Sequence, residues 1–258
     1  MNIISIIPAR MGSSRFPGKP MKKILGIPMI GHVYKRVKMC KTLKDVYVAT
    51  CDVEIFDYIK SIGGKPVMTS ESHERCTDRC AEAMIKIESE VGEKCDLMVL
   101  VQGDEPLVNP KMIDDSIAPM LKDKSITITN LVADIDSIEA FENRNEIKVV
   151  LDKDNNALYF SREPIPTRSK SKLKVPMKKQ ICITPFTRDF LLAYNEMKPT
   201  PLEVIESIDM MRILENGGKV KMVNTEFVTK AVDTQEDLDL VINMMKKDEL
   251  YSNYSQNE

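Results

Sequence analysis

The sequence has little of what membrane, nucleic-acid-binding and metal-cluster proteins require. It contains no tryptophan, only two histidines, and no run of eighteen apolar residues that could form a transmembrane helix. The N-terminus lacks the charged region and the cleavage site of a signal peptide. Positive charge is not in excess either, because 37 Lys and Arg residues face 39 Asp and Glu residues. We therefore expect a cytoplasmic protein whose partners are small molecules, with no membrane or nucleic acid among them.

Paired cysteine motifs are also lacking. The six cysteines show no CxxC spacing, and two histidines are too few to complete zinc sites with them. Cys76 and Cys80 could share one helical face and hold a metal, but buried thiols are the simpler interpretation in a cytoplasmic protein. The sequence predicts neither a disulfide nor a zinc site at Cys40, Cys51, Cys76, Cys80, Cys95 and Cys182.

What the sequence does contain is an ordinary globular composition, with 43% hydrophobic and 29% charged residues. No Pro/Gly/Ser-rich linker or charge block divides its 258 residues. We therefore predict one domain over residues 1–250 and a disordered tail over residues 251–258. Continuous apolar runs alternate with amphipathic stretches, which favours an α/β fold with a mainly parallel sheet.

The order of the elements begins as βαβ and becomes richer in strands after Glu146. The expected strands span residues 3–7, 46–50, 66–68, 97–101, 126–132, 147–151, 157–160, 181–186 and 220–223. The expected helices span residues 29–40, 53–62, 77–91, 110–121, 187–197, 202–216 and 234–247. Residues 168–179 carry six Lys or Arg side chains, which is typical of a mobile surface loop.

The loop that follows the first strand is the most informative segment. Residues 8–20 combine two glycines with three cations, Arg10, Arg15 and Lys19. Such a loop offers backbone N–H groups together with positive charge, and a triphosphate needs both. It also lies beyond the carboxyl end of a strand, where ligands bind in open α/β sheets. It is not a Walker A motif, because five residues separate the glycines and a proline follows the lysine, so a P-loop kinase or GTPase is disfavoured.

Carboxylates follow the most apolar strand. Asp104 and Glu105 come just after the run 97–101, where an unpaired carboxylate is costly to bury without a cation. Mg²⁺ takes one or two carboxylates together with phosphate oxygens, so this position predicts a magnesium site. Asp233 is a second candidate ligand, but Asp233 or Thr234 could instead cap the helix that begins there. The spacing leaves both interpretations of Asp233 open.

A series of short strings occurs in order along residues 2–245. They include Ile7-Pro8-Ala9-Arg10, Arg15-Phe16-Pro17-Gly18-Lys19-Pro20, Val101-Gln102-Gly103-Asp104-Glu105-Pro106, Lys148-Val149-Val150-Leu151-Asp152, Ala157-Leu158-Tyr159-Phe160-Ser161-Arg162 and Val232-Asp233-Thr234. In this order the strings resemble the nucleotide-sugar cytidylyltransferases, above all those that act on 3-deoxy-manno-octulosonate (Kdo). The resemblance implies a three-layer Rossmann-like nucleotide-diphospho-sugar transferase fold. It implies a mixed, mainly parallel sheet and a small β-rich section for acceptor binding and dimerisation.

The resemblance also implies an activity and a set of site residues. The enzyme would transfer CMP from CTP to the anomeric hydroxyl of Kdo or a related acidic sugar, release pyrophosphate, and serve surface-polysaccharide biosynthesis as a homodimer. Mg²⁺ would be bound by Asp104 and Asp233, and the implied catalytic residues are Arg10, Lys19, Asp104 and Asp233. The implied nucleotide-binding residues are Ala9, Arg10, Ser14, Arg15, Lys19, Arg75 and Thr77. The implied acceptor-binding residues are Arg79, Gln102, Gln180, Glu203 and Glu206.

The chain departs from the family pattern mainly around the sugar. Arg75-Cys76 stands where the family usually has Ser-Gly, and Gln180 and Val204 stand where it usually has histidine. The change at Arg75-Cys76 affects which base is selected and how the nucleotide is positioned. The changes at Gln180 and Val204 affect which acceptor sugar is bound. An enzyme for another sugar acid or a phosphonate is therefore an alternative. A non-catalytic nucleotide-binding protein is less favoured, because it has no need of two metal carboxylates.

Overall fold

The computed structural model describes residues 1–13, 16–170 and 172–255. Its contacts divide the chain into two compact units. Unit 1 comprises Met1–Asp114 and Val228–Glu258, and unit 2 comprises Asp115–Phe227. The chain thus leaves unit 1 and later returns to it, and the single domain expected over residues 1–250 stays a prediction.

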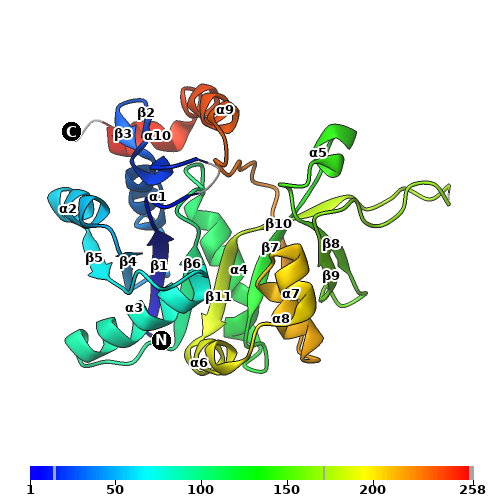
Figure 1. The fold of residues 1–258 in the computed structure, drawn as a ribbon, viewed down its shortest axis with the longest axis horizontal. Coiled ribbons are helices and arrows are strands. Elements are labelled where there is room, and N and C mark those ends of the chain that lie inside the picture. Colours follow the sequence, from blue (N-terminus) through cyan, green and yellow to red (C-terminus); the bar gives the residue numbers. More distant parts are fainter. Residues whose placement is uncertain (14–15, 171, 256–258) are drawn as a thin grey trace. The chain divides into compact units, whose positions relative to one another are not determined.

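Unit 1 is built on parallel strands in the order β6–β1–β4–β5 (Figure 1). Strand β1 (Ile3–Ala9) pairs with β4 (Asp45–Thr50) and with β6 (Leu97–Val101), and β4 also pairs with β5 (Lys65–Met68). Every residue of β1 and β6 is buried, as expected for parallel strands that are covered on both faces. The four strands expected in this part of the chain are confirmed.

Helices connect these strands. They are α1 (Met29–Val37), α2 (Val53–Ser61) and α3 (Cys76–Val91). After β6 the chain passes from unit 1 into unit 2 within α4 (Pro110–Lys122). All four helices are confirmed at their expected places. After the chain returns, unit 1 ends with α9 (Gln235–Met245) and α10 (Glu249–Ser255). Three short elements that the sequence analysis did not identify follow β1: a 3-10 turn η1 (Lys19–Met21), β2 (Lys23–Ile24) and β3 (Ile27–Pro28).

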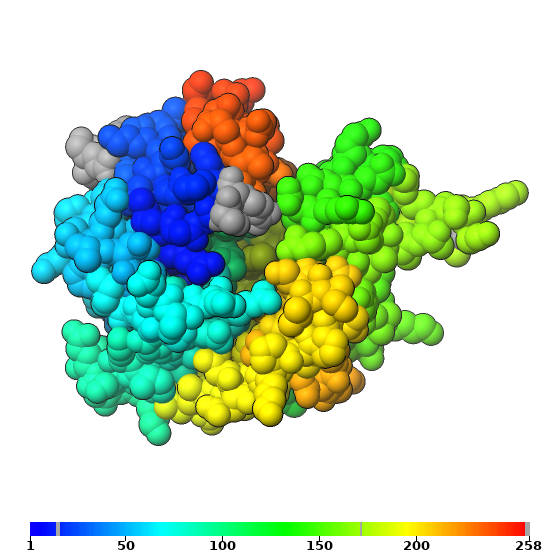
Figure 2. All heavy atoms as spheres, in the orientation of Figure 1, coloured from blue at the N-terminus to red at the C-terminus, as the bar shows by residue number. Residues whose placement is uncertain are grey.

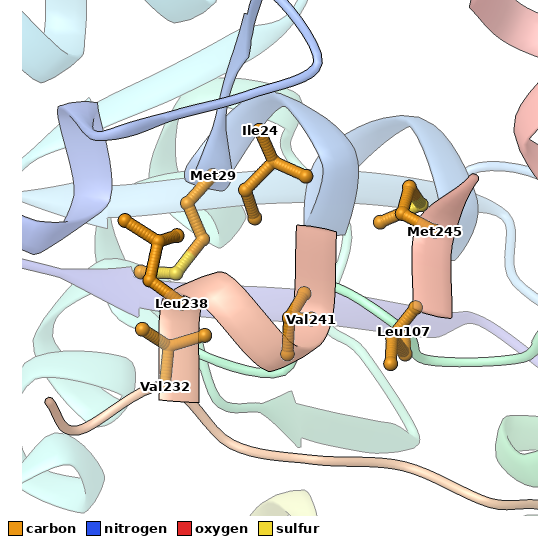
Figure 3. Close-up of a cluster of buried hydrophobic side chains, with 7 residues drawn as sticks. All are labelled: Ile24, Met29, Leu107, Val232, Leu238, Val241 and Met245. Atoms are coloured by element: carbon orange, nitrogen blue, oxygen red, sulfur yellow. The ribbon is translucent and has the colours of Figure 1, made fainter. Parts of the chain in front are cut away.

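An apolar cluster joins the two sequence segments of unit 1 (Figure 3). It contains buried side chains from β2, from the start of α1, from the segment between β6 and α4, and from α9 and the residues before it: Ile24, Met29, Leu107, Val232, Leu238, Val241 and Met245. Burying one such side chain fully contributes about 1.5–3 kcal/mol. The cluster therefore fixes α9, and the residues just before it, against the segment that follows η1.

Unit 2 holds a mixed sheet in the order β12–β7–β10–β8–β9. Its strands are β7 (Thr129–Asp134), β8 (Lys148–Leu151), β9 (Ala157–Ser161), β10 (Lys178–Ile181) and β12 (Lys221–Asn224). Strand β12 is parallel to β7, whereas the other pairs are antiparallel. The unit also contains β11 (Ile183–Thr187), α5 (Ile138–Glu142), α6 (Arg188–Glu196), α7 (Pro201–Glu206) and α8 (Met210–Glu215).

Two strands of unit 2 differ from their expected ranges. The strand expected over residues 181–186 is confirmed as β11 from Ile183 onward, but it is not continuous from Ile181, because β10 ends there. The side-chain amide of buried Asn130 donates to the carbonyls of both residues, at 2.9 and 3.0 Å, and so interrupts the strand. The strand expected over residues 126–132 begins only at Thr129 and continues to Asp134, since β12 pairs with residues 129–132 and β10 pairs with residues 131–134.

One expected helix and the expected disorder of the tail also differ from the structure. The helix expected over residues 202–216 is broken into α7 and α8 at Ser207, whose φ of 54° is left-handed. The break allows Arg212 of α8 to pair with Glu203 of α7. Within the tail that we expected to be disordered over residues 251–258, residues 251–255 belong to α10, because buried Tyr254 anchors them, and residues 256–258 lie outside the described residues.

The basic segment between β9 and β10 lies on the surface, as expected. Its described residues extend away from the flanking strands (Figure 1) and form a projection of exposed side chains (Figure 2). The expected loop was too long at its end, because Lys178 and Lys179 lie in β10, paired with β7. Among the described residues, no helix has the length and apolarity needed to cross a membrane.

Candidate active site

The loop after β1 carries Lys19 beyond the carboxyl end of that strand. The N–H of Gly18 donates to the carbonyl of Met11 at 3.0 Å and closes the loop. Gly18 has a φ of 71°, a left-handed conformation that glycine adopts without strain, and Lys19 then begins η1. The Asp52 carboxylate accepts the N–H of Met11 at 2.8 Å. Both ends of the loop are therefore held in place.

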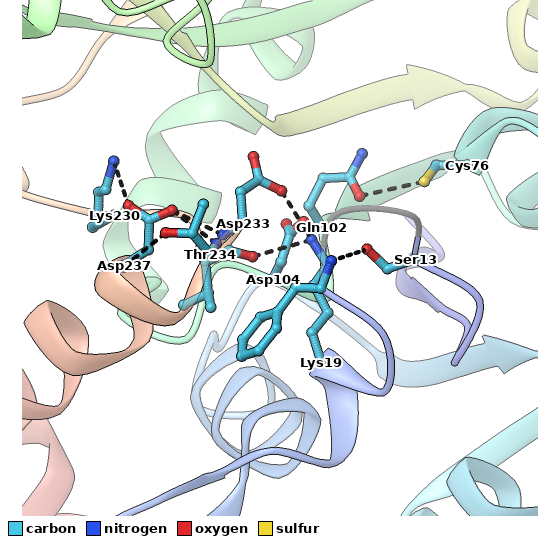
Figure 4. Close-up of polar contacts among 11 residues, drawn as sticks. Ser13, Lys19, Cys76, Gln102, Asp104, Lys230, Asp233, Thr234 and Asp237 are labelled. Atoms are coloured by element: carbon cyan, nitrogen blue, oxygen red, sulfur yellow. Dashed lines mark hydrogen bonds and ion pairs between the residues drawn. The ribbon is translucent and has the colours of Figure 1, made fainter.

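Lys19 brings together two carboxylates from distant parts of the sequence (Figure 4). Its Nζ lies 2.5 Å from Asp104 Oδ2 and 3.2 Å from Asp233 Oδ1, and it donates to the carbonyl of Val232 at 3.1 Å. The three charged side chains are largely buried, with exposures of 14%, 22% and 17%. The fold thus provides the proximity of Asp104 and Asp233 that spacing alone could not establish.

The environment of Lys19 keeps its ammonium charged. Burial by itself lowers the pKa of Lys19, because it penalises the charged form. The carboxylates of Asp104 and Asp233 outweigh this effect, so the pKa of Lys19 is raised above its ordinary value. A charged ammonium at this point is suited to bind phosphate oxygens.

Backbone contacts position Asp104. The residue before it is Gly103, where a Cβ would come within 2.8 Å of the carbonyl oxygen of Pro8, so a side chain does not fit. The N–H of Val232 donates to the carbonyl of Asp104 at 3.0 Å. This bond ties the turn after β6 to the segment that precedes α9.

The N-terminal cap of α9 bears on whether Asp233 caps this helix or is a candidate metal ligand. Thr234 is the N-cap, and it forms a capping box with Asp237. The carboxylate of Asp233 instead contacts Lys19. The capping interpretation of Asp233 is therefore wrong, and Thr234 has that role.

Arg10 and Arg79 both reach the segment between β5 and α3. Each donates to the carbonyl of His73, at 3.4 and 3.5 Å, and Arg79 also donates to Thr69 Oγ1 at 2.5 Å. Arg79 is only 3% exposed, so its guanidinium positions this segment. The acceptor contact expected for Arg79 stays a prediction. Arg10 is exposed and lies in the same loop as Lys19.

Glu82 secures the same segment from α3. Its carboxylate accepts the N–H of Ser70 at 2.9 Å, pairs with Lys86 at 2.6 Å, and contacts His73 Nε2. Burial by itself raises the pKa of Glu82, but these donors outweigh burial and lower it to about 2. Sequence reasoning missed Glu82 and Asp52. Asp52 could have been identified by the rule applied to the acidic turn after β6, since it also closely follows a strand of the sheet.

The other described nucleotide residues implied by the resemblance lie in β1 and at the start of α3. Ala9 ends β1 and is buried. Arg75 is the N-cap residue of α3, and Thr77 is buried in the first turn of that helix. Ser14 and Arg15 lie outside the described residues. Nucleotide contacts at all of these positions stay predictions.

Gln102 lies between Cys76 and the Lys19 cluster (Figure 4). The Cys76 thiol donates to Gln102 Oε1, with a sulfur–oxygen distance of 3.3 Å. Cys76 is the first residue of α3, so its backbone is right-handed and does not need the conformational freedom of glycine.

The remaining acceptor candidates lie in unit 2. Gln180 is in β10. Glu203 is 0% exposed, and both of its carboxylate oxygens accept hydrogen bonds from Arg212, at 2.6 and 2.7 Å. Glu206 accepts from Ser161 Oγ at 3.0 Å. These contacts give Glu203 and Glu206 structural roles within unit 2, and their contact with an acceptor stays a prediction.

Known proteins resemble this chain along almost its whole length. Residues 4–230 match the family described as Cytidylyltransferase. The chain belongs to the cytidylyltransferase family. Among curated members, a protein of Geobacter metallireducens named 3-deoxy-manno-octulosonate cytidylyltransferase is 42% identical over 257 residues, covering 96% of this chain and 99% of the relative. A Fusobacterium nucleatum protein of the same name is 40% identical, with coverage of 97% and 99%.

Solved structures place this cytidylyltransferase-family chain in the expected fold. The structure of CMP:2-keto-3-deoxy-manno-octonic acid synthetase complexed with CTP has a TM-score of 0.87 at 34% identity, covering 96% of this chain and 99% of the other. A cytidylyltransferase from Leptospira borgpetersenii shares the fold with a TM-score of 0.65 at 18% identity, covering 96% and 88%. The predicted α/β transferase fold is confirmed.

Proposed function

We propose that this protein transfers CMP from CTP to the anomeric hydroxyl of Kdo, or of a closely related sugar acid, for surface-polysaccharide synthesis. The observation that carries the proposal is the cluster of Lys19, Asp104 and Asp233, in a chain of the cytidylyltransferase family. Relatives that match over nearly their full length and are named for this reaction support the same acceptor.

The residues of unit 1 have defined tasks in this reaction. The anomeric oxygen attacks the α-phosphorus of CTP, the bond to the β-phosphate oxygen breaks, and the hydroxyl proton passes to water. Lys19 and Arg10 bind and orient triphosphate oxygens as negative charge moves onto the leaving pyrophosphate. The closed loop around Gly18 holds Lys19 in position. Positioning and electrostatic stabilisation therefore supply most of the acceleration.

Asp104 and Asp233 fit a magnesium ion. Both are carboxylates, and both already contact one cation, the Lys19 ammonium. Mg²⁺ needs only one or two protein carboxylates when phosphate oxygens and water complete its shell. When bound, the ion would neutralise charge on the phosphate oxygens. In the described part of the chain, no larger group of His, Cys, Asp and Glu side chains is suited to a metal.

A cytidylyltransferase for another acceptor is the alternative to test. Gln180 and Val204 replace histidines that the family resemblance leads us to expect near the sugar, so a modified octulosonate is included among the acceptors. A purely nucleotide-binding protein is disfavoured, because it would have no use for the buried cluster of Lys19, Asp104 and Asp233.

The deciding experiment is pyrophosphate release with Mg²⁺. CTP, UTP, ATP and GTP are each combined with Kdo, with its 8-amino analogue and with a nonulosonic acid. We expect turnover only with CTP, and fastest with one octulosonate. Turnover of the nonulosonic acid alone would replace the proposed acceptor. Binding of CTP without turnover of any acceptor would favour the nucleotide-binding alternative.

We also propose that the enzyme works as a homodimer in the cytoplasm, where CTP is available. Exposed apolar side chains of unit 2, such as Leu158, Val204 and Ile205, support an interface there. Light scattering should give twice the mass of the monomer, and a monomeric mass at micromolar concentration would contradict the dimer.

A further inference from the structure

The contact between Cys76 and Gln102 joins α3 to the turn that carries Asp104. Both side chains are half-buried, and the thiol donates to Gln102 Oε1 at 3.3 Å (Figure 4). Cys76 begins α3, whereas Gln102 directly follows β6. The contact therefore holds the side chain of Gln102, two residues before Asp104, the proposed metal ligand.

The backbone at Gln102 is already held by its neighbours. Gly103 packs so closely on Pro8 that a Cβ there would meet the carbonyl oxygen at 2.8 Å. The N–H of Glu105 donates to the carbonyl of Gln102 at 3.3 Å and closes the turn. What remains adjustable at Gln102 is its side-chain amide. An amide can present either its oxygen or its two N–H donors in a given direction, and its partner selects between them.

We propose that Cys76 is a positioning residue that sets the direction of the Gln102 amide. Because the thiol proton engages Oε1, the amide nitrogen is directed away from Cys76 and presents its N–H groups as donors. Such donors suit the carboxylate or hydroxyl oxygens of an acidic sugar. The inference rests on the proposed function, and it assigns acceptor positioning to a thiol at a position where the resemblance leads us to expect glycine.

Kinetics of three variants test this role. Cys76→Ala should raise the acceptor KM about three- to tenfold, as expected for one lost hydrogen bond. The KM for CTP should stay at the parent value. Cys76→Ser should restore the acceptor KM, because a hydroxyl can donate in the same way. Cys80→Ala, one turn further along α3, is the matched control and should behave as the parent.

A double-mutant cycle and a thiol probe complete the test. Cys76→Ala should add little to the acceptor KM of Gln102→Met, since both remove the same contact. Iodoacetamide should alkylate Cys76 about threefold faster in Gln102→Met than in the parent, because Oε1 holds the thiol proton. Peptide mass spectrometry measures that rate without any turnover, so the inference stays testable if the parent transfers CMP to no sugar acid. Additive kinetic effects, or equal alkylation rates, would overturn it.

Discussion

Lys19 and Asp233 are separated by 214 positions in the sequence, yet Lys19 Nζ lies 3.2 Å from Asp233 Oδ1. Asp104 joins them from a third segment, 2.5 Å from the same ammonium. The three meet because the chain returns to unit 1 at Val228 and the N–H of Val232 bonds to the backbone of Asp104. Both sequence segments of unit 1 must therefore be folded before the cluster exists.

Asp104→Asn should abolish turnover while leaving the fold intact. The substitution removes a carboxylate that is proposed to hold the metal, but Lys19 keeps its contact with Asp233. We expect kcat/KM to fall by about a hundredfold or more. Pyrophosphate release measures the loss, and thermal unfolding monitored by circular dichroism checks the fold.

The matched control for that variant is Asp239→Asn. Asp239 is an exposed residue of α9, so its replacement removes one negative charge without touching Lys19. The control should turn over at the parent rate. Near-parent activity in Asp104→Asn would rule out its role as a metal ligand.

Lys19→Met should destabilise the protein by leaving two neighbouring carboxylates without their cation. We expect a loss of about 1–3 kcal/mol in the free energy of unfolding at neutral pH. The raised pKa of Lys19 means that its contribution is fully present below the ordinary value of 10.5. The contribution disappears as the pH rises through the folded-state value above that. Denaturant unfolding at neutral and at strongly alkaline pH measures the difference.

Mg²⁺ should partly replace the missing ammonium. We expect the ion to raise the Tm of Lys19→Met more than that of the parent, because a ligand that binds only the folded state stabilises it. Lys23→Met, an exposed position in β2, is the control and should respond as the parent does. Equal Mg²⁺ effects on all three proteins would argue against a metal at Asp104 and Asp233.

Local sequence patterns were sufficient to predict the strands and helices that position the cluster of Lys19, Asp104 and Asp233. The continuous apolar runs of β1 and β6 and the amphipathic stretches of α1 and α3 are properties of neighbouring residues, so they could be recognised directly. Lys19 and Asp104 were identified because each follows such a strand. The role of Asp233 could not be decided in this way, because a residue before a helix can either cap it or face a distant cation.

Long-range side-chain contacts explain the expectations that failed. The side-chain amide of Asn130 donates hydrogen bonds to the carbonyls of Ile181 and Ile183, and the expected strand is interrupted between these two residues. Arg212 of α8 pairs with Glu203 of α7, and the expected helix is broken between them at the left-handed residue Ser207. In both places an apolar pattern continues through the break, so no local signal marks it.

Glu203→Gln should destabilise unit 2, and its acceptor KM tests the acceptor contact that the family resemblance implies for Glu203. The substitution leaves buried Arg212 without its bidentate carboxylate, which costs about 3–5 kcal/mol when a buried pair is broken. Tm should fall, and the acceptor KM of the protein that remains folded should rise if Glu203 also contacts the acceptor. Glu196→Gln, exposed on α6, is the control. A normal Tm with a raised acceptor KM would instead give Glu203 a ligand role.

Glu82→Gln should remove an acid-sensitive contribution to stability. The pKa of Glu82 lies at about 2 in the folded protein, below its ordinary value of 4.5. Its ionised form therefore stabilises the fold above about pH 4.5, and this contribution disappears as the pH falls toward 2. We expect a difference between parent and variant on the order of 2 kcal/mol at pH 7. Urea unfolding from pH 7 to pH 3 measures it against Glu90→Gln, an exposed control on α3. A difference that does not depend on pH would contradict the assignment.

Tyr254→Phe should loosen the C-terminal helix. The Tyr254 hydroxyl contacts His32 Nδ1 at 2.8 Å and accepts from Arg36 Nε at 3.0 Å, and both partners are 0% exposed. Removing the hydroxyl leaves buried polar groups without this partner, which costs about 1–3 kcal/mol. Burial raises the pKa of Tyr254 to about 12, so the hydroxyl stays protonated and the loss should be equal at pH 7 and pH 9. Ser252→Ala, on the exposed side of α10, should unfold as the parent does. If Tyr254→Phe did so as well, apolar burial of the ring, rather than its hydroxyl, would be what holds α10 to α1.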